Sequence, residues 1–187
     1  MEDHFKNINT SIYRLHRERY LPTKIKYLFV AESPPAFKTA APSAYFYFDT
    51  VPKADSLFYT ITKAIFDIDF DKYVNNRVET LYQFQDNGFY LIDAVDYPIN
   101  KDKNWENTPN SFRDEVIFNN RSVFEQNLNV LSANGNLNNQ TKSILIKETV
   151  FNQYGNYPLL NVANKKKIGF PSYIKDRRTI EAIRSVL

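Results

Sequence analysis

Two carboxylates of this chain lie at apolar runs that are each followed by proline. Glu32 and Ser33 follow the apolar run Tyr27–Ala31 and precede two prolines, and Asp93 lies in the run Leu-Ile-Asp-Ala-Val that ends at Pro98. A carboxylate can accept a proton or stabilise a developing positive charge. We therefore take Glu32, Ser33 and Asp93 as the candidate catalytic residues. The plainer alternative is that Glu32 caps a surface loop and that Asp93 caps the turn before Pro98.

A third proline-bearing loop, Gly169-Phe-Pro-Ser172, lies in the basic C-terminal quarter of the chain. Residues 142–187 hold nine Lys and Arg against three Asp and Glu, although the net charge of the whole chain is only +3. Such local excess suits a phosphate-bearing partner, and ordinary solvated surface is the alternative. The candidate residues for binding such a partner are Pro171, Ser172, Tyr173, Lys165, Lys166, Lys167, Lys175 and Arg177, with Arg178 beside them.

The aromatic run Tyr45-Phe-Tyr-Phe48 stands between the first carboxylate loop and the next expected helix. An aromatic face can stack on a planar ligand, and Phe46 or Tyr47 is the candidate ring. Since aromatic side chains are more often buried in the core, a packing role is the alternative.

Alternating apolar patterns predict the elements that would position these residues. Continuous apolar runs predict buried strands, and apolar residues three or four apart predict helices. The expected strands are Ile25–Ala31, Phe89–Val95, Ser143–Phe151 and Leu159–Val162. The expected helices are Ser11–Tyr20, Ala54–Phe66, Asn75–Gln85, Pro109–Leu131 and Thr179–Leu187, with an Asn-rich loop at Asn127–Gln140.

This alternation predicts an α/β fold, namely a three-layer α/β/α sandwich with a mainly parallel central sheet of about four strands. No internal repeat or long linker divides the chain, so residues 1–187 are expected to form one domain. Because the carboxyl ends of parallel strands meet at one edge, the three proline-bearing loops are expected to surround one pocket.

Composition excludes several classes of site. The chain has no Cys and four Gly, and it contains neither a G-x-G-x-x-G nor a Walker A pattern. Disulfides, thiolate zinc sites, iron–sulfur clusters and a Cys nucleophile are therefore excluded. His4 and His16 lie far in sequence from the loops, and we expect no metal and no cofactor. No apolar stretch is long enough for a membrane span, and we expect a cytoplasmic monomer.

The order of these motifs resembles that of the uracil-DNA glycosylase superfamily, over roughly Lys24 to Leu187. That family has a Gly-Gln-Asp-Pro or Gly-Glu-Ala-Pro loop after its first strand, and Ala31-Glu-Ser-Pro34 matches it. A base-stacking aromatic follows in the family, where this chain has Tyr45–Phe48. Asp93 stands at the position of the family's Asn, and Phe170-Pro-Ser172 stands in place of its His-Pro-Ser.

The resemblance implies hydrolysis of the N-glycosidic bond of a damaged or modified base in DNA. By this analogy Glu32 is the carboxylate near the sugar, Phe46 or Tyr47 stacks on the base, and Asp93 reads its edge. Tyr173 or Ile174 would wedge into the base stack. The family's Asn offers a donor and an acceptor, whereas an ionised Asp93 only accepts and would favour an exocyclic amine over a uracil carbonyl.

Two alternatives remain open at this point. Phe170 replaces the family's His and Ser33 replaces its acidic residue, so the chain could be a catalytically degenerate module that binds nucleic acid. Alternatively, the same pocket could hydrolyse free nucleosides or nucleotides, which would need little of the basic surface.

Overall fold

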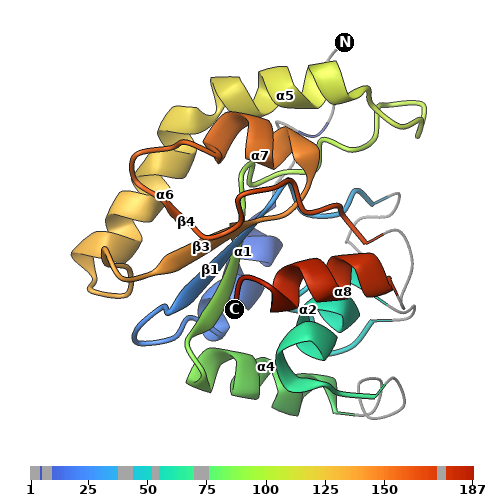
Figure 1. Cartoon of the computed structure of the whole chain (residues 1–187). Coiled ribbons are helices and arrows are strands. Elements are labelled where there is room, and N and C mark those ends of the chain that lie inside the picture. Colours follow the sequence, from blue (N-terminus) through green and yellow to red (C-terminus); the bar gives the residue numbers. More distant parts are fainter. Residues whose placement is uncertain (1–4, 6–9, 38–43, 52–54, 70–75, 172–175) are drawn as a thin grey trace.

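The structure is a computed structural model of the chain, and it describes residues 5, 10–37, 44–51, 55–69, 76–171 and 176–187 (Figure 1). The strands are β1 (Tyr27–Ala31), β2 (Phe89–Asp93), β3 (Lys142–Leu145) and β4 (Asn161–Val162). The helices are α1 (Ser11–Arg19), α2 (Ser56–Phe66), α4 (Arg77–Asp86), α5 (Asn110–Asn119), α6 (Arg121–Ala133), α7 (Glu148–Tyr154) and α8 (Arg177–Arg184).

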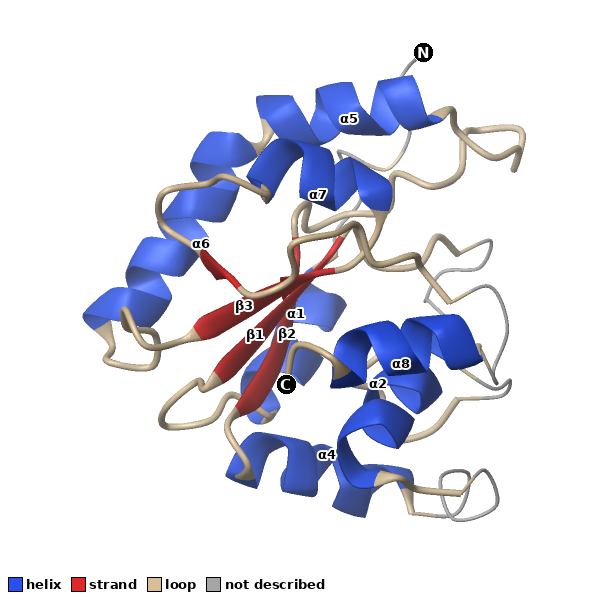
Figure 2. Cartoon of the chain, in the orientation of Figure 1, coloured by secondary structure: helices blue, strands red, loops and turns tan. Residues whose placement is uncertain are grey.

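The four strands form one open, all-parallel sheet in the order β2-β1-β3-β4. Helices α5, α6 and α7 gather on one side of this sheet, and α2, α4 and α8 gather on another (Figures 1 and 2). The expected α/β class and parallel sheet of about four strands are confirmed. The arrangement is compatible with three α/β/α layers.

Strand β1 lies between β2 and β3, and its apolar residues are covered by these neighbours and by packed side chains. Leu28, Phe29 and Val30 are fully buried. The Phe29 ring lies 6.0 Å from that of Phe84 in α4 and 6.3 Å from that of Phe89 in β2. Burial of such aromatic rings from water is a main driving force for folding. It fixes β1 and β2 side by side, so that their carboxyl ends meet.

Three sequence-based expectations are wrong. The single helix expected at Pro109–Leu131 is divided at Asn120 into α5 and α6. The expected strand Ser143–Phe151 ends early, at Leu145, and α7 begins at Glu148. The Asn-rich loop expected at Asn127–Gln140 begins late, because α6 runs on to Ala133. Within the described residues, moreover, no helix is both long and apolar enough to cross a lipid bilayer.

Candidate active site

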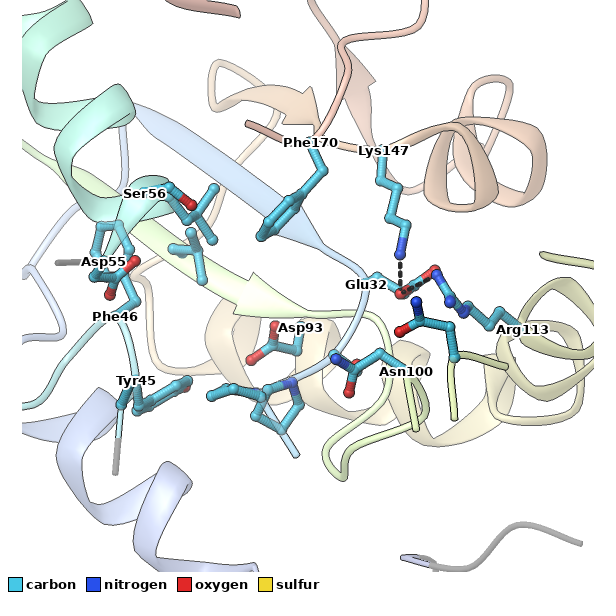
Figure 3. Close-up of a pocket in the computed structure, with 17 residues that line it drawn as sticks. Glu32, Tyr45, Phe46, Asp55, Ser56, Asp93, Asn100, Arg113, Lys147 and Phe170 are labelled. Carbon is cyan, nitrogen blue, oxygen red and sulfur yellow. Dashed lines mark hydrogen bonds and ion pairs between the residues drawn. The ribbon is translucent and has the colours of Figure 1, made fainter. Parts of the chain in front are cut away.

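A cavity of about 500 Å³ opens where the carboxyl ends of β2, β1 and β3 meet. Parallel pairing places Ala31 opposite Asp93, and Val30 opposite Leu145. The next polar side chains beyond these pairs are Glu32 and Lys147, and both line the cavity with Asp93 (Figure 3). Two of the three proline-bearing loops therefore supply carboxylates to one space, and Phe170 of the third loop lies on its wall.

Glu32 is a buried carboxylate with cationic and hydroxyl partners. Its side chain is 5% exposed, and it forms an ion pair with Lys147 Nζ. The Arg113 guanidinium lies 3.7 Å from the same oxygen, and Thr149 Oγ1 donates a 2.6 Å hydrogen bond to the other oxygen. Figure 3 shows Lys147 and Arg113 pointing toward Glu32 from different elements. These partners stabilise the ionised carboxylate, which suits electrostatic stabilisation of a cation.

Lys147 reaches Glu32 from an unusual backbone conformation. Its φ is 85° and its ψ is 147°, a region that is almost restricted to glycine and costs about 1–3 kcal/mol for other residues. The backbone N–H of Lys147 donates a 2.7 Å hydrogen bond to Ile168 O, which holds this conformation. Burial lowers the pKa of Lys147, and Glu32 opposes that shift.

Asp93 also lines the cavity, and it is 5% exposed. Desolvation raises its pKa to about 7, with further raising by Asp96 and Glu32, and Arg17 opposes the shift. Near neutral pH, Asp93 is therefore partly protonated, in contrast to the ionised carboxylate assumed from sequence. A protonated carboxyl both donates and accepts a hydrogen bond, as the amide of an Asn does.

Asn100 and Tyr45 add polar atoms to the cavity. Both residues line the cavity, and Asn100 Oδ1 is buried without a hydrogen-bond partner in the described part of the chain. The buried Tyr45 hydroxyl lies near Asp93 and acts on the pKa of that carboxyl. A buried acceptor without a partner costs about 1–3 kcal/mol, so a ligand that donates to Asn100 would recover free energy.

The two candidate stacking rings, Phe46 and Tyr47, have different surroundings in the structure. Phe46 lines the cavity and is 2% exposed in the free protein. Tyr47 does not line it, because its hydroxyl accepts a 2.7 Å hydrogen bond from Leu91 N and donates to Leu91 O at 3.1 Å. These bonds satisfy backbone groups of β2, so Tyr47 has a structural position in the core.

Arg77 holds the aromatic segment against the cavity. Its guanidinium is buried and donates to the carbonyl oxygens of Tyr45, Phe46 and Phe48 at 2.7–2.9 Å. It also pairs with Asp55, the N-cap of α2, at 3.0 Å. One side chain thus joins the segment that carries Phe46 to the start of α2.

Of the other site residues predicted from the sequence, only some lie at the cavity. Ser33 lines the cavity, whereas Pro171 is buried outside it and its carbonyl accepts a 3.1 Å hydrogen bond from Ser56 Oγ. The loop residues Ser172, Tyr173, Ile174 and Lys175 lie outside the described residues. The remaining basic candidates are exposed and do not line the cavity, and they are Lys165, Lys166, Lys167, Arg177 and Arg178. Lys167 forms an ion pair with Glu148.

The sequence-based reasoning missed Lys147, Arg113, Thr149 and Asn100. A signal existed for Lys147, because it follows a buried strand at the same edge as Glu32. The other three approach the cavity through tertiary packing: Arg113 is held by hydrogen bonds to the Thr108 side chain and carbonyl at 2.8 and 2.6 Å.

The comparisons with known proteins leave family and activity open. No protein-family model, curated protein or solved structure matches the chain. The cavity, with Glu32 and Asp93 at adjacent strand ends, is therefore the basis for assigning a function.

Proposed function

We propose that this protein is a uracil-DNA glycosylase-like enzyme that hydrolyses the N-glycosidic bond of a damaged or modified base in DNA. The observation that carries the proposal is the convergence of Glu32, Asp93 and Phe46 on one cavity. Its volume of about 500 Å³ falls within the range of pockets that bind small molecules, so a base with part of its sugar can enter.

Each side chain suits a different part of this reaction. Cleavage of the glycosidic bond develops positive charge on the sugar, and the ionised Glu32 stabilises such charge. The departing base carries negative charge and gains from hydrogen-bond donors at its edge. A protonated Asp93 supplies one donor, and the Asn100 amide lines the same space.

Phe46 and Phe170 suit the flat faces of a base that has left the helix. Phe46 comes from the segment held by Arg77, and Phe170 is 46% exposed at the cavity wall. Aromatic or apolar walls commonly hold a flipped base while polar groups read its edge. The exposed Lys165 and Lys166, with Arg177, supply positive charge for a phosphate backbone.

The test is release of a free base from duplex DNA that carries one uracil, hypoxanthine, xanthine or alkylated base. At enzyme excess we expect one of these duplexes to yield an abasic site, detected by mass spectrometry of the released base. Glu32→Gln should slow this release about a hundredfold or more. Glu125→Gln is the matched control, because Glu125 is exposed and does not line the cavity, and it should keep near wild-type activity.

Three outcomes that would contradict the proposal can be distinguished. Absence of base release from every duplex would reject DNA glycosylase activity. Release from a free nucleoside, with no inhibition by duplex DNA, would instead select the nucleoside hydrolase. Salt-dependent DNA binding without any base release would select the binding module.

A further inference from the structure

The Glu32 carboxylate does not need Lys147 as its counter-ion. Arg113 already lies 3.7 Å from the Glu32 carboxylate and Thr149 donates to it, so the charge has other partners. Lys147 nevertheless occupies a backbone conformation suited to glycine and places its amine on the cavity wall. Among the described residues, the only side chain that forms a hydrogen bond or ion pair with this amine is Glu32.

We propose that Lys147 is a nucleophile that forms an imine with C1′ of the abasic sugar left by base removal. This inference rests on the proposed function. If Glu32 lies against the sugar to stabilise charge at C1′, the Lys147 amine, which contacts Glu32, lies near the same carbon. The sequence motifs assign no such role to this position.

The surroundings of Lys147 favour a reactive amine. Burial disfavours the ammonium form and lowers its pKa, as for lysines that react with carbonyl groups. Glu32 is in contact with Nζ and can accept the proton that must leave before the amine attacks. Lys167 provides an internal contrast, since it pairs with Glu148 on the exposed surface, outside the cavity.

The reaction needs no oxidant or metal. Lys147 Nζ transfers one proton to Glu32, and its lone pair forms a bond to C1′ of the open-chain aldehyde. Loss of one water gives the protonated imine. Glu32, which has returned its proton to the departing water, then takes the C2′ proton, the C3′–O bond breaks, and the 3′ phosphate leaves with the electron pair. Hydrolysis of the imine regenerates the amine and releases an unsaturated aldehyde.

The test uses the full chain and a duplex with one preformed abasic site, in the presence of cyanoborohydride, which reduces an imine to a stable secondary amine. We expect a covalent protein–DNA adduct, and peptide mapping by mass spectrometry should place it on Lys147. Lys147→Arg keeps a cation beside Glu32 and should lower the adduct yield at least tenfold. Lys24→Arg, an exposed lysine before β1 that does not line the cavity, should leave the yield unchanged.

The wild-type mapping decides the question even if a variant folds poorly. No adduct, or an adduct spread over surface lysines, would overturn the proposal. Because the abasic site is preformed, the result is independent of base release. Base release without an adduct rejects only the Lys147 proposal, and an adduct without base release rejects only the glycosylase proposal.

Discussion

At the scale of single residues, burial decides what Asp93 can do. The carboxyl has a pKa of about 7 in the folded protein, against 3.8 for an ordinary aspartate. The groups that act on it are Arg17 and Asp96, together with Tyr45 and Glu32 across the cavity. Between these two pKa values the folded state binds more protons than the unfolded state, so stability falls as pH rises through that window.

Asp93→Asn tests this property. The amide does not ionise, so the variant should lack the fall in stability. We expect the free energy of unfolding of the variant, relative to wild type, to rise by about 2–3 kcal/mol between pH 5 and pH 8. Urea denaturation at several pH values measures it. Parallel pH profiles for the two proteins would show that Asp93 titrates normally.

Tyr47→Phe tests the structural role assigned to that ring. The change removes the hydroxyl that bonds to Leu91 N and O, and it leaves two buried backbone groups of β2 without this partner. We expect a loss of about 1–3 kcal/mol of stability, measured by denaturant unfolding. A variant as stable as wild type would mean that those groups find other partners.

It could be predicted from the sequence that Glu32, Ser33, Phe46 and Asp93 line one cavity, because strand ends in a parallel sheet meet at one edge. It did not suffice to separate Phe46 from its neighbour Tyr47. Adjacent aromatic residues look alike in sequence, and only the position of Leu91 relative to the Tyr47 hydroxyl shows which ring belongs to the core.

At the scale of elements, the segment that carries Phe46 depends on Arg77 at the start of α4. Arg77→Met keeps much of the side-chain length but removes the hydrogen bonds to three carbonyl groups and the ion pair with Asp55. Loss of a buried charged network costs about 3–5 kcal/mol. We expect this loss in denaturant unfolding, together with weaker binding of any ligand that contacts Phe46.

Arg19→Met is the matched control. Arg19 pairs with Asp49 at the surface, with 45% of its side chain exposed, so its replacement should change stability little. Equal effects of the two substitutions would contradict the assigned role of Arg77.

The element boundaries that sequence missed have physical reasons. The apolar pattern of Ser143–Phe151 predicts one strand, yet the chain changes direction at Lys147 and continues as α7. Lys147 has a positive φ, and such a turn is hard to predict where the residue is not a glycine. Helix α6 extends through residues of low helix propensity because Phe124, Leu128 and Leu131 bury one stripe. Tertiary packing decided both boundaries.

At the scale of the whole molecule, two groups of three exposed lysines lie at different places relative to the sheet. Lys165, Lys166 and Lys167 follow β4 and precede the loop of Phe170. Lys24, Lys26 and Lys142 are also exposed, and they lie near the amino ends of β1 and β3, at the opposite end of the strands from the cavity. The two groups carry the same charge, so reversal of either group changes the net charge equally, and the two variants differ only in the position of the change.

Reversal of each group to Glu tests the proposed DNA surface. Reversal of Lys165–Lys167 should weaken duplex binding at least tenfold and reduce its dependence on salt, because each lost phosphate contact changes the logarithmic slope by about 0.9. Reversal of Lys24, Lys26 and Lys142 should have a much smaller effect. Fluorescence anisotropy at several salt concentrations measures both, and equal effects would point to non-specific charge attraction.

The most direct test of the central claim is a crystal structure with a duplex whose target nucleotide carries a 2′-fluoro sugar that resists cleavage. We expect the base to lie in the cavity against Phe46, with its edge at Asp93 and Asn100 and C1′ beside Glu32. A base that remains stacked in the duplex, or one bound on another surface while this cavity stays closed to it, would contradict the account.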